Sequence, residues 1–183
     1  MIFFETKLKK NFLITHDNLE DKRGSLKRIF CQKTLEPLLQ NKTIRQINHT
    51  ITKKEGTVRG LHFQNPPYQE IKIVSCLKGK VWDVAVDLRK GSPTFLQHHT
   101  AILSEDNQQS FLIPEGFAHG FQTLEDNCEM LYFHTKDYNS KSESVINALD
   151  PSLKIQWPKL IVERSERDKK PNNITKDFLG IEQ

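Results

Sequence analysis

A histidine and a lysine lie on the two arms of one predicted hairpin, in the stretch RGLHFQNPPYQEIK (residues 59–72). The first arm carries His62 and the second carries Lys72, with a proline-rich turn between them. Both positions are predicted to face inward, where a purely structural hairpin would carry Val or Leu. The pattern therefore aims a base and a cation at a shared interior space.

The chemistry that suits this pair is proton abstraction next to a carbonyl group. A neutral imidazole with a pKa of roughly 6.5 is a suitable base at neutral pH. A lysine ammonium in a pocket of low dielectric constant stabilises the developing enolate oxygen. A carboxylate bonded to the far nitrogen of the histidine would fix its tautomer. Reprotonation from the opposite face inverts the carbon, which is the reaction of an epimerase or isomerase.

The elements that must position this pair are short strands. From residue 43 onward, β-rich segments alternate with turn signals such as Asn65-Pro66-Pro67 and Pro114-Glu115-Gly116, which favours an all-β sandwich or barrel. The period-two pattern places His62 opposite Leu61 and Phe63. Several strands therefore have one bulky apolar face and one face of small and isolated polar residues, as around a lined cavity. The segment 34–40 is the one short helix that the sequence predicts before the C-terminal tail.

Composition sets the broad class of protein. The 183 residues predict one domain, with an N-terminal arm of about residues 1–30 and a C-terminal tail of about residues 159–183 packing on the barrel or on a partner subunit. The net charge of +4 is spread along the chain, so no nucleic-acid partner is expected. No apolar run approaches the roughly 18 residues of a membrane helix, and the N-terminus lacks a secretory pattern. Three cysteines without a CxxC pair are expected to stay reduced in a cytoplasm.

Two segments resemble the metal motifs of cupins, the jelly-roll β-barrel family. HFQ followed by Glu70 or Lys72 lies where the first motif has His-x-His and Glu, and PEGFAHGFQT resembles the second motif, Pro-x-Gly-x-x-His. Gln64 replaces one histidine, and Lys72 takes the carboxylate position. A cation beside the remaining His62 and His119 would repel a divalent ion, so no bound metal is predicted.

A more specific resemblance covers almost the whole chain. The segments DKRG, RGLHFQ, QEIKIVSCLKGKVWDVAVDLRKGSPTF, LSEDNQQSFLIPEGFAHGFQTL, EMLYFHT and SERD occur in the order typical of the dTDP-4-dehydrorhamnose 3,5-epimerase family. The resemblance implies a cupin-type jelly roll that works as a homodimer without metal or cofactor. It further implies epimerisation at C3 and C5 of a nucleotide-linked 4-keto-6-deoxyhexose, namely dTDP-4-dehydro-6-deoxyglucose, towards dTDP-L-rhamnose.

The resemblance also implies roles for individual residues. His62 matches the family's base, Asp168 the carboxylate paired with it, and Lys72 the lysine that steadies the 4-keto oxygen. The arginines Arg59 and Arg23 match diphosphate contacts, with Arg23 reaching into the neighbouring subunit's site; a planar guanidinium grips phosphate oxygens in pairs. The remaining matches are Gln46 and Asn48 for the nucleotide, and His119, Tyr132 and Asp83 for the pocket lining. Tyr132 and Tyr138 complete the catalytic candidates.

Two departures leave alternatives open. The family's acid tyrosine falls on Asp137 here, with Tyr138 one step later, so Tyr138 serves, or water or Asp137 delivers the proton, or one epimerisation is lost. After DKRG the chain has Ser25, Leu26, Lys27 and Arg28 where the family has aromatics and a Glu, which weakens the case for dTDP. The competing functions are a 3-only or 5-only epimerase, a 3,4-ketoisomerase of a related sugar, and a non-catalytic sugar-binding cupin.

Overall fold

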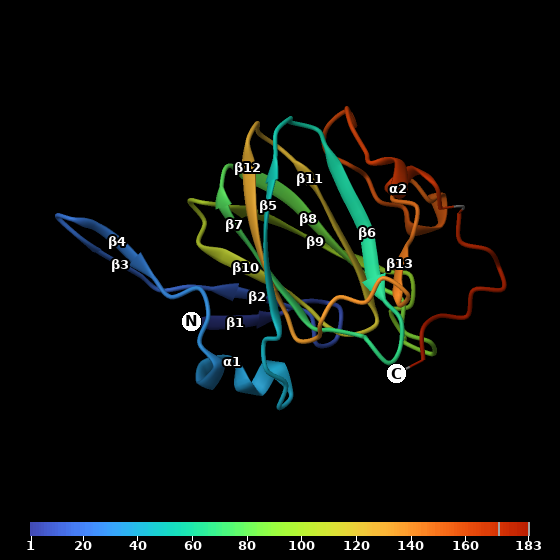
Figure 1. Ribbon diagram of the computed structural model, residues 1–183, viewed down its shortest axis with the longest axis horizontal. Coiled ribbons are helices and arrows are strands. Elements are labelled where there is room, and N and C mark those ends of the chain that lie inside the picture. The colour runs from blue at the N-terminus through green and yellow to red at the C-terminus, as the bar shows by residue number, and fades with distance from the viewer. Residues whose placement is uncertain (172, 183) are drawn as a thin grey trace.

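Two antiparallel sheets face each other in this computed structural model, which describes residues 1–171 and 173–182 (Figure 1). The six-stranded sheet has the order β1-β2-β10-β7-β12-β5, and the five-stranded sheet has the order β13-β6-β11-β8-β9. The strands are β1 (Ile2–Glu5), β2 (Phe12–Thr15), β3 (Asn18–Asp21), β4 (Gly24–Lys27), β5 (Gln46–Thr52), β6 (Val58–Gln64), β7 (Lys72–Lys78), β8 (Lys80–Asp87), β9 (His98–Ser104), β10 (Gln109–Ile113), β11 (Phe117–Thr123), β12 (Cys128–His134) and β13 (Glu143–Val145). The predicted all-β jelly-roll class is confirmed.

The central strands β10 and β11 bury both of their faces, with alternate side chains pointing to opposite sides of the sheet. Between the sheets, Val74 and Phe111 of the six-stranded sheet meet Ala85 and Phe121 of the five-stranded sheet. The outer face of the six-stranded sheet packs under the helix α1 (Gln32–Leu39), which begins two residues earlier than the sequence predicts. The jelly roll therefore has apolar layers outside as well as inside its sheets.

The C-terminal segment covers the outer face of the five-stranded sheet. Leu61 and Val84 point outward and join a cluster with Trp157 and Ile161. The segment includes the 3-10 helix η1 (Pro151–Leu153) and the short helix α2 (Glu166–Lys169), which starts where the Ser165 hydroxyl accepts a hydrogen bond from the Asp168 amide at 3.1 Å. Figure 1 shows α2 beside β6, so the cap places an acidic residue next to the strand that carries His62.

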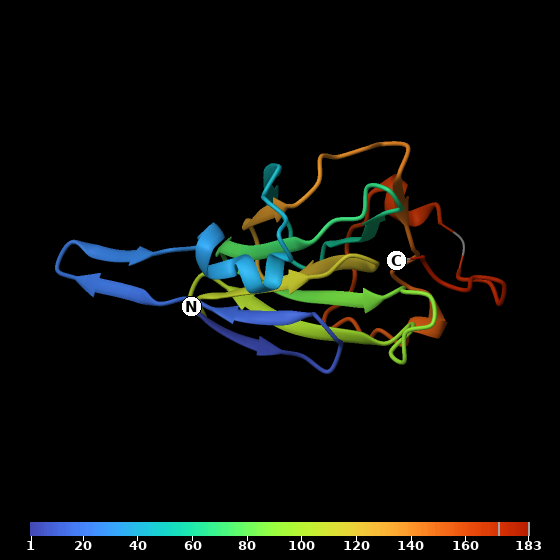
Figure 2. The ribbon, with the colours of Figure 1, turned by 90° about the horizontal axis from the view of Figure 1, so that it is seen from below.

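A two-stranded ribbon projects from the body of the protein. β3 and β4 pair only with each other, and Figures 1 and 2 both show them extending well beyond the two sheets. The residues that the sequence predicts as an N-terminal arm thus divide into two parts: β1 and β2 extend the six-stranded sheet, and the ribbon leaves it. The large apolar side chains Leu19 and Leu26 of the ribbon are 67% and 68% exposed.

Candidate active site

A cavity of about 320 Å³ opens between the two sheets beside the inner apolar core, with which it shares Phe121. Its wall on the five-stranded sheet includes Arg59, His62 and His119, and its wall on the six-stranded sheet includes Lys72 and Tyr132. The His119 and Tyr132 rings meet edge to face with their centroids 6.1 Å apart, so the two walls face each other directly. The inward-facing positions predicted for His62 and Lys72 are therefore both part of one pocket.

His62 is held by the carboxylate of Asp168, which lies on the short helix α2 beside the strand β6. The Nε2 atom lies 2.7 Å from Oδ1 of Asp168, whose other oxygen accepts a hydrogen bond from the Gly60 amide at 3.3 Å. Burial would raise the pKa of Asp168, but the bonds from His62 and the Gly60 amide outweigh burial and hold it below its ordinary value. Asp168 is consequently ionised at neutral pH. It fixes the imidazole with its proton on Nε2 and its lone pair on Nδ1.

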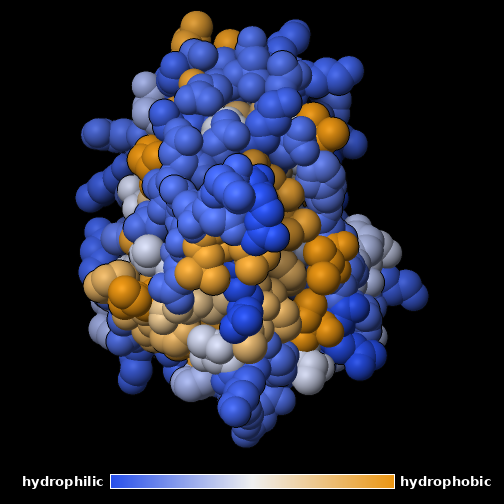
Figure 3. All heavy atoms as spheres, turned by 90° about the vertical axis from the view of Figure 1, so that its left-hand side faces the viewer, coloured by the Kyte–Doolittle hydropathy of each residue, from blue (hydrophilic) through white to orange (hydrophobic). Residues whose placement is uncertain are grey.

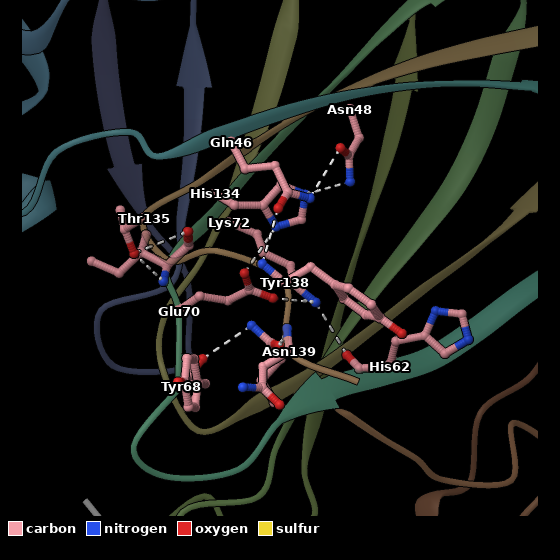
Figure 4. A network of polar contacts seen from close by, with 12 residues as sticks. Gln46, Asn48, His62, Tyr68, Glu70, Lys72, His134, Thr135, Tyr138 and Asn139 are labelled. Carbon is pink, nitrogen blue, oxygen red and sulfur yellow. Dashed lines mark hydrogen bonds and ion pairs between the residues drawn. The ribbon is translucent and has the colours of Figure 1, made fainter. Parts of the chain in front are cut away.

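Lys72 enters the cavity from the opposite sheet as a buried cation, only 7% exposed. Its ammonium lies 3.1 Å from Oε1 of Glu70 and 3.5 Å from the carbonyl oxygen of His62 (Figure 4). The carboxylate compensates the charge of the ammonium in a site where an unpaired charge would be costly. A lysine held charged in this way is suited to stabilise negative charge on a bound oxygen.

His119 is fixed by a second, fully buried acid. Its Nε2 lies 2.9 and 3.0 Å from the two oxygens of Asp83, which pairs with β11 from the adjacent strand β8. Burial raises the pKa of Asp83, although the nearby His119 acts in the other direction. Burial also raises the pKa of Tyr132, so the phenol stays protonated at neutral pH and is a hydrogen-bond donor to the cavity.

The predicted nucleotide contacts lie at the edge of the same cavity. The guanidinium of Arg59 donates from Nε to the Thr52 hydroxyl at 2.9 Å, which fixes the side chain across the cavity wall. On β5, the Gln46 amide donates to Asn48 Oδ1 at 3.1 Å. These groups supply hydrogen bonds at the open side of the pocket.

Tyr138, and not Asp137, lines the cavity. The Tyr138 hydroxyl donates to Glu143 Oε2 at 2.9 Å, and the residue is 54% exposed. Asp137 instead lies 3.8 Å from Arg45 in a surface ion pair. The geometry thus favours a shifted loop that brings Tyr138, and not Asp137, to the cavity.

The predicted site residues therefore fall into three groups. The cavity lining contains Gln46, Asn48, Arg59, His62, Lys72, His119, Tyr132 and Tyr138. Two acids contact histidines of this lining: Asp168 contacts His62, and Asp83 contacts His119. Arg23 lies elsewhere, at the tip of the ribbon, where its guanidinium pairs with Asp21 at 2.6 Å and its side chain is exposed.

Four further charged or titratable residues of the cavity were missed from the sequence. They are Glu70, His134, Glu143 and Arg167. Arg167 comes from α2, lies 2.8 Å from Glu143 and has Nη2 3.2 Å from His62 Nε2. For Arg167 the available signal was its position next to Asp168, because a helix that delivers one residue to a pocket brings its neighbour close as well.

Within residues 1–171 and 173–182, no group of three or more His, Cys, Asp and Glu side chains is arranged to hold a metal ion. Gln64, at the position of a cupin metal ligand, donates to the Tyr68 carbonyl oxygen at 3.1 Å and accepts from the Asn139 amide at 2.7 Å. The side chain thus fastens two loops together. The expected absence of a metal or cofactor stays a prediction. The described helices include none that is long and apolar enough to cross a membrane.

Comparisons with known proteins identify the family of the chain. A profile of the dTDP-4-dehydrorhamnose 3,5-epimerase family matches residues 5–176. The dTDP-4-dehydrorhamnose 3,5-epimerase of Salmonella typhimurium is 42% identical over 159 residues, which cover 86% of either chain. Among solved structures, the dTDP-6-deoxy-D-glucose-3,5-epimerase of Legionella pneumophila in complex with dTDP-4-keto-L-rhamnose is 37% identical, with a TM-score of 0.92 over 100% of this chain and 98% of that one. The Bacillus anthracis enzyme with TDP and PPi bound is 34% identical, with a TM-score of 0.89 over 94% and 99% of the respective chains. The chain belongs to the dTDP-4-dehydrorhamnose 3,5-epimerase family.

Proposed function

We propose that this protein is an isomerase that inverts C3 and C5 of a dTDP-linked 4-keto-6-deoxyhexose. The observation that carries the proposal is the meeting of three groups: His62 and Lys72 face one cavity, and Asp168 lies 2.7 Å behind His62. The names of the relatives support the substrate, since the Legionella enzyme holds dTDP-4-keto-L-rhamnose and the Bacillus enzyme holds TDP.

The first chemical step assigned to His62 is abstraction of the proton from C3 or C5. The electron pair of the broken C–H bond forms a carbon–carbon double bond to C4, and the carbonyl pair moves onto the C4 oxygen. Lys72 stabilises the enolate oxygen through its ammonium group. His62 takes the proton on Nδ1, and the resulting imidazolium is stabilised by Asp168 through Nε2.

Inversion requires a proton donor on the other face of the sugar, and we assign that role to Tyr132. Tyr132 lies on β12 of the six-stranded sheet, whereas His62 lies on β6 of the five-stranded sheet, and both line the cavity. The phenol gives its proton to carbon as the enolate collapses to the ketone. The phenolate then takes a proton from solvent while His62 releases one, so the cycle conserves protons. Tyr138, with its hydroxyl bound to Glu143, is assigned to closing the mouth.

We further propose a homodimer in which the ribbon formed by β3 and β4 reaches the neighbouring subunit and delivers Arg23 to the diphosphate. Support comes from the exposed Leu19 and Leu26, and from the apolar surface that Figure 3 shows around the projecting ribbon. Apolar side chains on a projecting ribbon have no core of their own and favour a partner surface. Arg59, Gln46 and Asn48 would hold the nucleotide from within the subunit.

Incubation with dTDP-4-keto-6-deoxyglucose in deuterated water tests the function. Deuterium at both C3 and C5, with the L-configured product, is the expected result. Deuterium at C3 alone would identify the protein as a 3-epimerase. A carbonyl group moved from C4 to C3 would identify a ketoisomerase. Binding of the sugar nucleotide without any exchange would leave only a sugar-binding cupin. Sedimentation of the protein with and without the ribbon tests the dimer.

A further inference from the structure

His134, a third histidine of the cavity, has its own carboxylate and lies on the wall opposite His62. His134 donates from Nδ1 to Oε2 of Glu70 at 3.0 Å, while Oε1 of the same carboxylate lies 3.1 Å from the Lys72 ammonium (Figure 4). Both Glu70 and His134 line the cavity and both are buried. One carboxylate thus fixes two side chains that line the cavity.

The backbone and the neighbouring ring fix this arrangement further. His134 and Lys72 are paired residues of the adjacent strands β12 and β7, so their side chains point into the cavity next to each other. The imidazole also stacks on the Tyr132 ring, with centroids 6.2 Å apart and an angle of 15° between the planes. The imidazole therefore has a set orientation as well as a set position.

This orientation leaves one ring nitrogen available. Because Nδ1 gives its proton to ionised Glu70, Nε2 of the neutral ring carries a lone pair and is an acceptor. Burial would raise the pKa of Glu70, but the bond from His134 and the charge of Lys72 outweigh burial and keep it below its ordinary value. Among the described residues, the Asn48 side-chain amide lies 3.4 Å from Nε2, which is longer than a normal hydrogen bond.

We propose that His134 Nε2 accepts a hydrogen bond from the hydroxyl group on C3 while Lys72 donates to the ketone oxygen on C4. Glu70 is the positioning residue that holds this donor and acceptor side by side. The inference rests on the proposed function and narrows its substrate class to α-hydroxy ketones. An enolate formed between C3 and C4 carries both oxygens in one plane, so an adjacent donor and acceptor match it better than two donors would.

A comparison of two sugars tests the role of His134. Exchange of the C5 proton is measured in deuterated water with the dTDP-linked 4-keto-6-deoxyhexose and with its 3-deoxy analogue, which lacks only the hydroxyl that His134 would bind. In the wild-type protein, loss of the hydroxyl should lower kcat/KM about tenfold, the value of one neutral hydrogen bond. His134→Ala should lower kcat/KM about tenfold for the hydroxylated sugar and leave the analogue nearly unchanged.

Two further variants make the test specific. Glu70→Gln should also bring the kcat/KM values of the two sugars closer together. Lys72 and His134 contact different oxygens of Glu70, and in glutamine one of these two positions becomes an NH2 donor that cannot accept. His49→Ala is the matched control, since His49 is bound to Glu129 at 3.0 Å outside the cavity lining and should keep the wild-type ratio. If the ratio of kcat/KM between the two sugars is unchanged in both His134→Ala and Glu70→Gln, this inference is overturned and the proposed function still stands. A wild-type protein that exchanges neither sugar would overturn the proposed function and the inference together.

Discussion

Oδ1 of Asp168 lies 2.7 Å from Nε2 of His62, although 106 positions separate the two residues in the chain. The carboxylate is buried and also binds the Gly60 amide, so it approaches the imidazole in one fixed direction. This contact selects the imidazole tautomer before any substrate enters. In the proposed mechanism it also stabilises the imidazolium that forms when a proton leaves carbon.

Replacing either member of this pair should abolish most of the activity. His62→Ala removes the base and should lower the rate of deuterium incorporation at both C3 and C5 by about 10³-fold. Asp168→Asn keeps the shape of the side chain but removes its charge, and should lower the same rates by about 10²–10⁴-fold. NMR-detected exchange in deuterated water measures both rates. An Asp168→Asn variant with unchanged rates would contradict the assignment of this carboxylate to His62.

The two tyrosines are expected to differ in a way that separates exchange from inversion. With Tyr132→Phe, His62 still removes a proton and returns one to the same face, so solvent deuterium should appear without formation of the epimer. The rate of inversion should fall at least about 10²-fold, as for loss of a general acid.

Tyr138→Phe is the matched variant at the cavity mouth. It removes a hydroxyl that is bound to Glu143, so inversion should persist with at most a modest rise in KM. Chromatographic separation of the epimers, combined with mass measurement of incorporated deuterium, gives both quantities. If inversion is lost in Tyr138→Phe and retained in Tyr132→Phe, then Tyr138 is the proton donor and Tyr132 is not.

The sequence predicted the inward direction of site residues that lie within strands. It predicted much less about site residues that lie in loops or that meet through the pairing of two strands. Leu61, His62 and Phe63 alternate between faces of β6, so the inward direction of His62 follows from period two alone. Lys72 starts β7 in the same way. Asp168 could be inferred only through the resemblance of SERD to a family motif, because the tail that carries it has no periodicity to read.

Glu70 and His134 escaped prediction for a different reason. The two residues are 64 positions apart, and neither is unusual in its own segment. Their meeting depends on the pairing of β12 with β7, a register that the printed sequence does not specify. The choice between Asp137 and Tyr138 also depended on the course of a loop, where a shift of one residue exchanges the inward and outward side chains.

Asp87 should make the folded state sensitive to acid. This buried carboxylate receives hydrogen bonds from Arg89 Nη2 at 2.7 Å and from the hydroxyls of Ser92 and Thr94 at 2.6 Å each. Burial would raise the pKa of Asp87, but these donors outweigh burial and lower it from the ordinary value of 3.8. The stabilisation is therefore complete above about pH 4 and disappears as the pH falls through the lowered value.

Asp87→Asn tests this prediction in urea unfolding experiments. At pH 7 the variant should lose about 2–4 kcal/mol of unfolding free energy, because the Arg89 guanidinium is left without its carboxylate. Below pH 4 the difference between the variant and the wild type should shrink. A difference that stayed constant from pH 7 to pH 3 would contradict the lowered pKa.

Gly120 should not tolerate a side chain, because β6 and β11 approach there without room for one. A Cβ on Gly120 would lie 2.6 Å from the Arg59 carbonyl oxygen and 2.8 Å from Leu61 Cδ2. The pairing of these strands is irregular between His119 and Phe121, so the close approach coincides with a change of register beside the cavity. Any displacement of β6 would move both Arg59 and His62.

Gly120→Ala is expected to cost about 1–3 kcal/mol in unfolding free energy, as for other overpacked sites, and to lower epimerase activity in the fraction that stays folded. Gly91→Ala is the control, because a Cβ there meets nothing within 4 Å and only the φ of +71° is strained. The control should lose about 1 kcal/mol or less and keep its activity. Equal losses of stability in the two variants, with full activity in both, would show that β6 and β11 have more freedom than their spacing indicates.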